Sequence, residues 1–385
     1  MQATRTEEKT AETHGGASSP QPQQRLRDKK VGDLIAGKKR LVEVPYTASL
    51  ADTINTLVAN RIMAVAVAAP PGQWIGAGGS MILESDKQTG AVRKHYIGMV
   101  TMLDVLAHIA GNDDAPAVEG GGGGGGELER KMQVPVSTII GHCLESLSLW
   151  TLNYNTSILD CMEVFSKGIH RALVPVDGHL ENVGGVELME SASSYHMVTQ
   201  MDLIKFLKVH EAELRGILTR RVRELGGLTD IVFGVTDKTN LIDAIKCMNS
   251  ASLHAVPIVE STDEIDDDHG QLVNGKDRKL VGTFSATDLR GCPISQLQSC
   301  LHMNIVDFLE KLLDTPQQEA CGLRTSTREH ITCQPESLLR EVVDKAINSH
   351  VHRVWVVDGR GLLAGLVSLT DIIRVIRVWM LSEPA

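Results

Sequence analysis

The stretch from His350 to Arg374, HVHRVWVVDGRGLLAGLVSLTDIIR, decides the fold of this 385-residue chain. Residues 354–357 form a short apolar run with β-branched and aromatic side chains, and residues 362–369 form a second apolar run. Between the two runs, residues 358–361 carry the glycines of a tight turn. The stretch therefore predicts a β-hairpin, and apolar residues at helical spacing after it predict a helix.

A helix start of a recognisable kind follows the hairpin. Ser368 stands three residues before Asp371, which is the spacing of a hydroxyl and a carboxylate in an N-terminal cap. The same corner, a strand followed by hydroxyl-x-x-Asp, occurs four times along the chain. The four corners are Thr101 with Asp104, Thr199 with Asp202, Ser285 with Asp288, and Ser368 with Asp371. This recurrence indicates internal repeats.

Each corner is preceded by the same elements. Four segments begin with a capping-type residue and carry apolar residues at helical spacing, so they predict amphipathic helices. The expected helices span residues 49–60, 157–166, 240–249 and 337–348, and the expected strands after them span 64–68, 172–176, 255–259 and 354–357. A short strand before the first helix is expected at 41–44 and at 230–235. The unit is an α/β (α+β) fold.

Composition limits the class of protein. The chain is too long for one ordinary core, and its hydrophobic content of 42% suffices for several. A net charge of -10 argues against a general binder of nucleic acid or of anionic membranes. Seven cysteines without a Cys-x-x-Cys pair indicate a reducing compartment, and no segment has the features of a signal peptide or membrane span. We expect a cytoplasmic or nuclear protein, or one found in both.

The domain boundaries follow from the corners. The predicted repeats span residues 26–112, 131–215, 216–295 and 296–385. Residues 1–25 predict a disordered tail because they lack an apolar core. Residues 113–130 contain the run Gly120–Gly126 and predict a flexible linker.

The corners suit a nucleoside phosphate. A helix start exposes unpaired N–H groups that favour an anion, the hydroxyl adds a donor, and the Asp could accept hydrogen bonds from a ribose diol. Apolar strand residues such as Val174 or Val356 could line an adenine slot. The same motif is also an ordinary cap that needs no ligand. Recurrence alone does not decide between these interpretations, because a repeat also repeats its caps.

Basic residues at strand starts favour the anion hypothesis for two repeats. The pairs are His170–Arg171 in the second repeat and His352–Arg353 in the fourth. The third repeat has only His254, and the first has Arg61 without a histidine. Alternation along a strand would place His350 and His352 on one side unless the chain bends there. The sequence shows no catalytic motif and no zinc-ligand spacing, so we expect neither catalytic residues nor a metal site.

The order of elements and the four corners resemble cystathionine-β-synthase (CBS) domains. Four in tandem resemble two paired CBS (Bateman) modules. With the His-Arg pairs and the run Leu203–Lys208 (LIKFLK) after the second corner, the chain resembles the gamma regulatory subunit of AMP-activated and sucrose-nonfermenting-type protein kinases. It is most similar to the plant gamma-like CBS proteins.

This resemblance implies a non-catalytic regulatory subunit. It implies AMP, ADP or ATP as regulatory ligands, no required cofactor, and association with a kinase catalytic subunit and a beta-type scaffolding subunit. The implied nucleotide-binding residues are Thr101, Asp104, His170, Arg171, Thr199, Asp202, Ser285, Asp288, His352, Arg353, Ser368 and Asp371. The alternative is a constitutive interaction scaffold that binds no nucleotide and whose corners are caps only.

Overall fold

The computed structural model describes residues 25–69, 96–111, 127–141, 149–176, 194–226, 228–262, 268–288, 292, 294–313 and 330–383. The predicted N-terminal tail up to residue 24 and the run Gly120–Gly126 lie outside the described residues. So do most of the residues between the two hairpin strands of the first two repeats.

Four small sheets carry the fold, one in each repeat. Repeat 1 contains β1 (Glu43–Pro45), α2 (Leu50–Asn60), β2 (Ala64–Ala68), β3 (Tyr96–Thr101) and α3 (Met102–Ala110). Repeat 2 contains α6 (Ile158–Ser166), β4 (Arg171–Pro175), β5 (Tyr195–Thr199) and α7 (Gln200–Val209). Repeat 3 contains β6 (Phe233–Thr236), α9 (Leu241–Ser250), β7 (Ala255–Val259), β8 (Val273–Asn274) and β9 (Leu280–Ser285). Repeat 4 contains β10 (Thr332–Cys333), α13 (Leu339–Asn348), β11 (Arg353–Val357), β12 (Leu363–Ser368) and α14 (Leu369–Ser382).

The hairpin predicted in repeat 4 is confirmed. Strands β11 and β12 pair antiparallel, and β10 pairs parallel with β11. In the turn, Asp358 Oδ1 accepts hydrogen bonds from the N–H groups of Arg360 and Leu362, both at 2.8 Å. Gly361 has φ +80°, a left-handed conformation that glycine adopts without steric cost. The sheet of repeat 1 has the same arrangement, with β1 parallel and β3 antiparallel to β2.

A left-handed residue follows, within two positions, the helix that precedes each hairpin. The four residues are Arg61, Gly168, Ser252 and His350, with φ of 54°, 91°, 52° and 53°. Each lies three positions before the first residue of the following strand. The chain therefore bends at His350, whose side chain is exposed and not aligned with that of His352. At the start of that helix in repeat 4, the capping position is Leu338 and not the expected Ser337.

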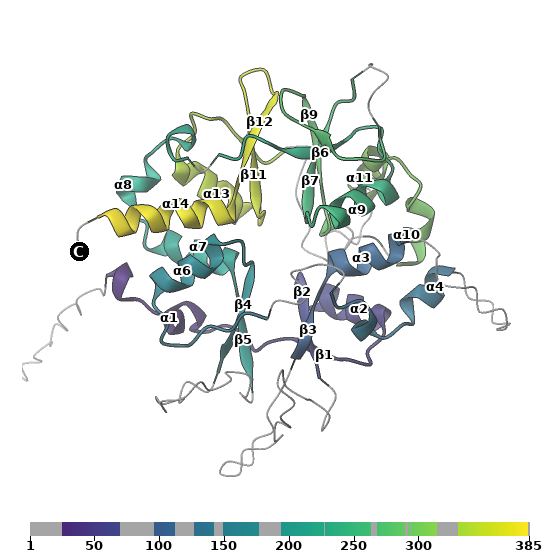
Figure 1. Ribbon diagram of the computed structural model, residues 1–385, viewed down its shortest axis with the longest axis horizontal. Coiled ribbons are helices and arrows are strands. Elements are labelled where there is room, and N and C mark those ends of the chain that lie inside the picture. Colours follow the sequence, from purple (N-terminus) through teal and green to yellow (C-terminus); the bar gives the residue numbers. More distant parts are fainter. Residues whose placement is uncertain are drawn as a thin grey trace, which may run out of the picture.

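Alternating strand residues divide each sheet into two faces. In β11, Val354 and Val356 are fully buried against helices of repeats 2 and 4, which share one core. Helices of repeats 1 and 3 share a second core. Trp355 points the other way and packs with Val232, Val259 and Leu280 of repeat 3. Figure 1 shows this arrangement, with the sheets of repeats 3 and 4 facing each other in the upper half and those of repeats 1 and 2 in the lower half.

The segments that lead into the repeats cross to the neighbouring repeat. The leader helix α1 (Val31–Ile35) packs in the core of repeats 2 and 4, and Val31 N–H donates to Thr156 O at 2.9 Å. Helix α4 (Glu127–Met132), which leads toward repeat 2, packs in the core of repeats 1 and 3. The same exchange joins repeats 3 and 4, where Val222 N–H donates to Ser337 O at 3.0 Å. Repeats 1 and 2, and repeats 3 and 4, are therefore interlocked pairs.

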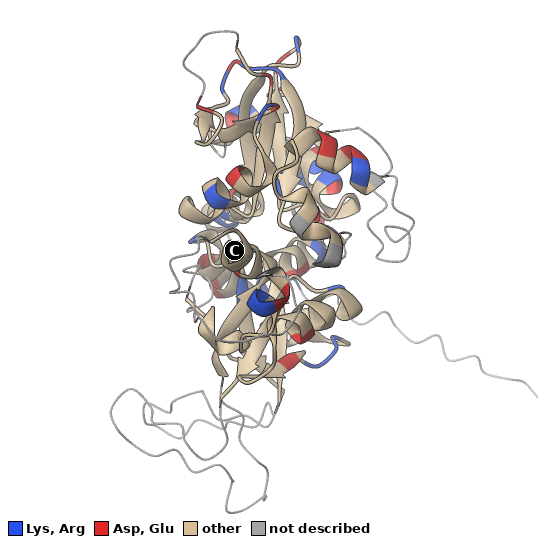
Figure 2. Cartoon of the chain, turned by 90° about the vertical axis from the view of Figure 1, so that its right-hand side faces the viewer, with Lys and Arg blue, Asp and Glu red and all other residues tan. Residues whose placement is uncertain are grey.

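The remaining helices connect these elements. They are η1 (Leu26–Asp28), η2 (Val136–Thr138), α8 (Arg215–Leu218), η3 (Val222–Glu224), α10 (Ile294–Cys300) and α11 (Ile305–Leu313). Basic and acidic residues alternate along the helices coloured in Figure 2. Within the described residues, no helix combines the length and the apolar character that crossing a membrane requires.

Candidate functional site

Three of the four corners are complete capping boxes. In each, the Asp Oδ2 accepts from the backbone N–H and the hydroxyl of the corner residue, and the hydroxyl oxygen accepts from the Asp N–H. Ser368 Oγ lies 2.6 Å from Asp371 Oδ2, and Thr101 Oγ1 lies 2.6 Å from Asp104 Oδ2. The helix starts predicted at these three corners are confirmed, and the capping role alone accounts for one oxygen of each carboxylate.

The third corner differs from the prediction. Ser285 N–H donates to Asp288 Oδ2 at 2.7 Å, but Ser285 Oγ donates to His254 O at 3.3 Å. Residues 286 and 287 form a turn and Asp288 has 3-10 conformation, and among the described residues the next α-helix is α10, which begins at Ile294. In the sequence, Gly291 and Pro293 follow this corner, and both residue types disfavour a helix. The expectation of a helix beginning directly at Ser285 was wrong.

Strand register places a cation beside two of the corners. Arg171 is paired with Thr199, and Arg353 is paired with Ser368. The two His-Arg pairs therefore occupy equivalent positions in repeats 2 and 4. In repeat 1, Ala64 takes this position opposite Thr101, so the first corner has no cation across the strand pair.

Side chains from three repeats meet where these strands begin. The rings of His170 and His254 are in edge contact, with centroids 5.9 Å apart. Burial, together with the nearby charges of Arg171, His170, Arg353 and His254, lowers the pKa of His352 to about 3. We call these five residues, His170, Arg171, His254, His352 and Arg353, the junction cluster. Their strands approach one another near the middle of Figure 1.

The junction cluster is largely withdrawn from solvent. Arg171 is only 6% exposed, and the other four members are partly buried. Arg353 Nη1 donates to Ala255 O of repeat 3 at 2.6 Å. Burial lowers the pKa of Arg353 to about 10, so its guanidinium is still charged at neutral pH. Confined cations that repel one another favour an anion among them.

The corner carboxylates differ in what else they contact. Asp371 Oδ1 lies 2.6 Å from Arg374 Nη2, so both oxygens of Asp371 have partners. Asp202 Oδ2 is paired with Lys38 from the leader of repeat 1. Asp104 is fully buried. A ribose hydroxyl would therefore have to bind a carboxylate held by Arg374 at the fourth corner, one paired with Lys38 at the second, or a fully buried one at the first.

Several predicted features lie away from the junction cluster. Val174 and Val356 are fully buried in the core of repeats 2 and 4, so neither can line an adenine slot. The expectation was wrong because the strand turns these residues toward the helices. Lys208, at the end of the run after the second corner, is paired with Glu211 and Asp344, each at 2.7 Å.

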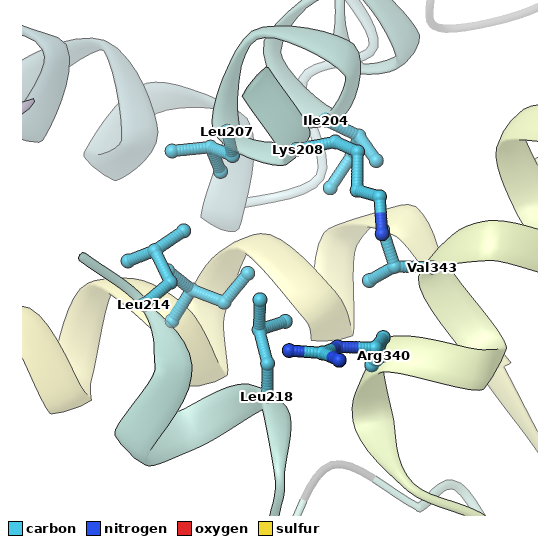
Figure 3. Close-up of a pocket in the computed structure, with 8 residues that line it drawn as sticks. Ile204, Leu207, Lys208, Leu214, Leu218, Arg340 and Val343 are labelled. Carbon is cyan, nitrogen blue, oxygen red and sulfur yellow. The ribbon is translucent and has the colours of Figure 1, made fainter. Parts of the chain in front are cut away.

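A small hollow lies between the helices of repeats 2 and 4. It encloses about 260 Å³, part of it open to solvent, and six of its eight lining residues are apolar. Figure 3 shows Arg340 reaching toward Leu218 from one side and Lys208 from the other. Arg340 Nε is buried, with no hydrogen-bond partner among the described residues. The hollow is separate from the corners and from the junction cluster. In the part of the chain that the structure describes, no cluster of three His, Cys, Asp or Glu side chains is arranged to hold a metal.

Two residues of the site were not singled out as ligands from the sequence. His254 joins the junction cluster from repeat 3, and its position directly before β7 matches that of His352 before β11. Lys38 reaches Asp202 from the crossed leader. Aligning the four strand starts could have identified His254, whereas the crossing that brings Lys38 to the second repeat has no local sequence signal.

Comparison with known proteins identifies the family. A chain of Arabidopsis thaliana named SNF1-related protein kinase regulatory subunit gamma-like PV42a is 54% identical over 375 residues, which cover 96% of this chain and 98% of that protein. The chain belongs to the SNF1-related protein kinase regulatory subunit gamma-like family. PV42b of the same plant is 55% identical over 360 residues, covering 93% of this chain and 97% of that protein.

More distant comparisons agree with the fold of this gamma-like family. The 5'-AMP-activated protein kinase subunit gamma-3 of Sus scrofa is 25% identical over 348 residues, covering 89% of this chain and 55% of that protein. The family model of the CBS domain matches residues 324–378, which lie in repeat 4. The crystal structure of protein MJ1225 from Methanocaldococcus jannaschii superposes with a TM-score of 0.54 at 18% identity, covering 90% of this chain and 99% of that one. This last likeness concerns the fold alone.

Proposed function

We propose that the chain is a non-catalytic regulatory subunit that binds an adenine nucleotide with its phosphate at the junction cluster. The nucleotide is AMP, ADP or ATP, and its binding shifts the arrangement of the two repeat pairs. A kinase catalytic subunit and a beta-type scaffolding subunit in the cytoplasm or nucleus respond to that arrangement. A ligand has this effect only if its affinity differs between the two arrangements.

The convergence of five basic side chains from repeats 2, 3 and 4 carries the proposal. Each charged group that acts on His352 is itself basic, and like charges held this close repel one another. A phosphate would relieve this repulsion and accept charge-assisted hydrogen bonds from Arg171 and Arg353. The corner residues Thr199 and Ser368 are paired across the strands with these arginines, which suits a nucleotide whose ribose lies beside the corner.

The family's names support the kinase part of the proposal. Its relatives are called regulatory subunits of SNF1-related protein kinases, and a more distant relative is called a subunit of the 5'-AMP-activated protein kinase. The kinase in the proposal is therefore of the SNF1-related or 5'-AMP-activated type that these names carry.

A constitutive scaffold is the second candidate. The three complete capping boxes favour it, because these corners already have a structural role. In addition, Arg374 already occupies the second oxygen of Asp371. Under this proposal the junction cluster binds no nucleotide.

Titration of the purified chain with AMP, ADP and ATP by isothermal calorimetry separates the two candidates. We expect binding that weakens by about ten- to hundredfold in Arg353→Gln and in Arg171→Gln, since a hydrogen bond to a charged group contributes about 1.5–3 kcal/mol. Arg223→Gln is the matched control, because Arg223 pairs with Glu336 on the surface. If no nucleotide binds at millimolar concentration, nucleotide sensing is excluded and the constitutive scaffold is the remaining candidate.

A pull-down with the kinase catalytic subunit tests the partner separately. We expect the wild-type chain to retain the kinase in the presence of the beta-type subunit. Failure to retain the kinase would contradict the regulatory role even if nucleotide binds.

A further inference from the structure

The second and fourth corners carry the same carboxylate but lie beside leaders that differ in charge. The leader that crosses to repeat 2 and the leader that crosses to repeat 4 begin with the same bond, in which Val31 N–H and Val222 N–H donate to a carbonyl of the neighbouring repeat at 2.9 and 3.0 Å. Seven residues further on (38 minus 31, 229 minus 222), one leader carries Lys38 and the other carries Thr229.

Strand register shows that Lys38 and Thr229 occupy equivalent positions. At the far end of the leaders, Val44 of β1 and Val235 of β6 each pair parallel with the fourth residue of the strand that follows in their repeat. Val44 lies six residues after Lys38, and Val235 lies six residues after Thr229 (44 minus 38, 235 minus 229). The two leaders therefore have the same length, and a cation in one stands where the other has a neutral hydroxyl.

Lys38 is held against the second corner. Its ammonium group is paired with Asp202 Oδ2, and only 25% of the Lys38 side chain and 29% of the Asp202 side chain are exposed. The backbone beside it is fixed, because Lys39 O lies 2.9 Å from Nδ1 of His196 in β5. The same carboxylate oxygen accepts from the N–H and the hydroxyl of Thr199 at 2.8 and 2.7 Å. Three donors therefore converge on this oxygen, and one of them is a largely buried cation.

At the fourth corner the leader contributes a neutral residue. Thr229 N–H donates to Leu366 O at 3.1 Å and Thr229 O accepts from Leu366 N–H at 2.9 Å, so this leader lies directly beside β12. Asp371 is paired instead with Arg374 from its own helix, whose side chain is 49% exposed. An ion pair is weaker where water reaches it, so Arg374 yields to a competing ligand at a lower cost than Lys38 does.

We propose that Lys38 selects the corner at which a bound nucleotide places its ribose. The inference rests on the proposed function, which puts the phosphate at the junction cluster and leaves both the second and the fourth corner open to the ribose. A ribose at the second corner has to displace the Lys38 ammonium group from Asp202. A ribose at the fourth corner has to displace only the exposed Arg374. The ribose therefore binds at Asp371, and the leader of repeat 1 closes the second corner to it.

Transfer of the threonine to the first leader tests this selection. Asp371→Ala should weaken AMP binding by about tenfold, the effect of losing a hydrogen bond to a charged group. Adding Lys38→Thr to Asp371→Ala should restore the AMP affinity by about three- to tenfold, because the second corner then accepts the ribose. Lys39→Thr in the same background is the matched control, since Lys39 is the next residue of the leader and is exposed. It should restore nothing. Isothermal calorimetry measures these affinities.

Transfer of the lysine to the second leader is the reciprocal test. Thr229→Lys should weaken AMP binding by about three- to tenfold, because a cation now competes for Asp371. It should not weaken the binding of pyrophosphate, which has no ribose. Thr229→Met is the control, because it adds a side chain of similar length without charge, and it should weaken neither ligand. A damaged site would instead lose affinity for AMP and for pyrophosphate alike.

The outcomes separate the two proposals. If AMP binds to the wild type but Lys38→Thr restores no affinity, or Thr229→Lys weakens AMP no more than pyrophosphate, selection by Lys38 is wrong and nucleotide binding stands. Selection is also wrong if Asp202→Ala weakens AMP binding as much as Asp371→Ala does. If neither the wild type nor Lys38→Thr binds AMP at millimolar concentration, the proposed function fails as well. If the double variant does not fold by circular dichroism, Thr229→Lys decides alone.

Discussion

Even-numbered and odd-numbered repeats share one fold but present different side chains to each other. At the first strand position after the left-handed turn, repeats 2 and 4 carry Arg171 and Arg353, whereas repeats 1 and 3 carry Ala64 and Ala255. Arg353 extends across its pair and donates to the carbonyl of Ala255. The difference shows that the pairs are asymmetric. The even repeat supplies the cation, and the small residue of the odd repeat leaves space beside it.

The same asymmetry continues two positions further along the strands. Trp355 and Leu173 of the even repeats are buried in the contact between sheets. The corresponding residues of the odd repeats are Pro257 and Ala66. Trp355 Nε1 also donates to Thr283 Oγ1 of repeat 3 at 2.7 Å. In each pair, the even repeat thus contributes the larger of the two side chains at this position. Trp355, in the pair of repeats 3 and 4, is larger than Leu173 in the pair of repeats 1 and 2.

Trp355→Ala should give the largest effect, because it removes the main contact within the pair of repeats 3 and 4. We expect a loss of about 3–5 kcal/mol in the free energy of unfolding, the range for large aromatic residues in cores. Leu173→Ala is the equivalent change in the other pair, and it should cost less, about 2–3 kcal/mol, because its contact is smaller. Urea denaturation followed by circular dichroism measures both.

Val209→Ala serves as the surface control, since Val209 is 80% exposed. It should change the unfolding free energy by less than about 0.5 kcal/mol. An equal or greater loss in Leu173→Ala than in Trp355→Ala would show that the pair of repeats 1 and 2 depends on its sheet contact at least as strongly.

The corner carboxylates give a second test of how the odd and even repeats differ. Asp104→Ala and Asp371→Ala each remove a complete capping box, so each should lower the free energy of unfolding by about 1–2 kcal/mol. Asp288→Ala should cost less, because this corner lacks the reciprocal bond and the two residues after Ser285 form a turn. Of these three variants, only Asp371→Ala and Asp288→Ala should alter AMP affinity. Arg353 is paired with Ser368 of the fourth corner and donates to the carbonyl of Ala255, which is paired with Ser285 of the third, whereas the corner of Asp104 faces Ala64 and no cation.

Denaturation and AMP titration on the same preparations measure both properties. Loss of AMP binding in Asp104→Ala, at unchanged secondary structure, would contradict the view that the first corner is only a cap. If Asp288→Ala and Asp104→Ala lower the free energy of unfolding equally, the turn at the third corner stabilises the protein as much as the helix start at the first.

Sequence alone predicted the repeated unit because its signals are local. Each hydroxyl-x-x-Asp corner and each apolar strand is complete within a few residues, and the first hairpin strands formed within one residue of their expected starts. The short strands expected at 41 and 230 begin later, at Glu43 and Phe233. The third corner could have been corrected from Gly291 and Pro293, which stand in the first turns of the expected helix.

The arrangement of the site needed the structure. Nothing near Lys38 in the sequence relates it to Asp202, because the crossed leader brings them together. The meeting of His170 with His254 likewise depends on how the two pairs pack. Charge-bearing residue types at strand starts could be predicted, whereas their convergence on His352 could not. The nucleotide-binding role of the twelve predicted residues stays a prediction.

The smallest predicted effect concerns the contact that distinguishes the fourth corner from the first. Arg374 is 49% exposed on its side chain, so its pair with Asp371 should contribute about 0.2–1 kcal/mol. A ribose hydroxyl that binds Asp371 must compete for the same oxygen. Arg374→Ala should therefore raise the affinity for AMP by about 1.5- to fivefold and leave the affinity for pyrophosphate, which has no ribose, unchanged.

Calorimetric titration of both ligands measures this difference, with Arg360→Ala as the control, because Arg360 pairs with Asp358 in the hairpin turn. The direction of the change identifies what Arg374 does. A weaker affinity for both ligands would mean that Arg374 contacts the phosphate, because its loss would then remove a cation from the site. An unchanged affinity for AMP would mean that Asp371 holds no ribose. The fourth corner would in that case be a cap like the first, and the even repeats would differ from the odd ones only in the cations they supply.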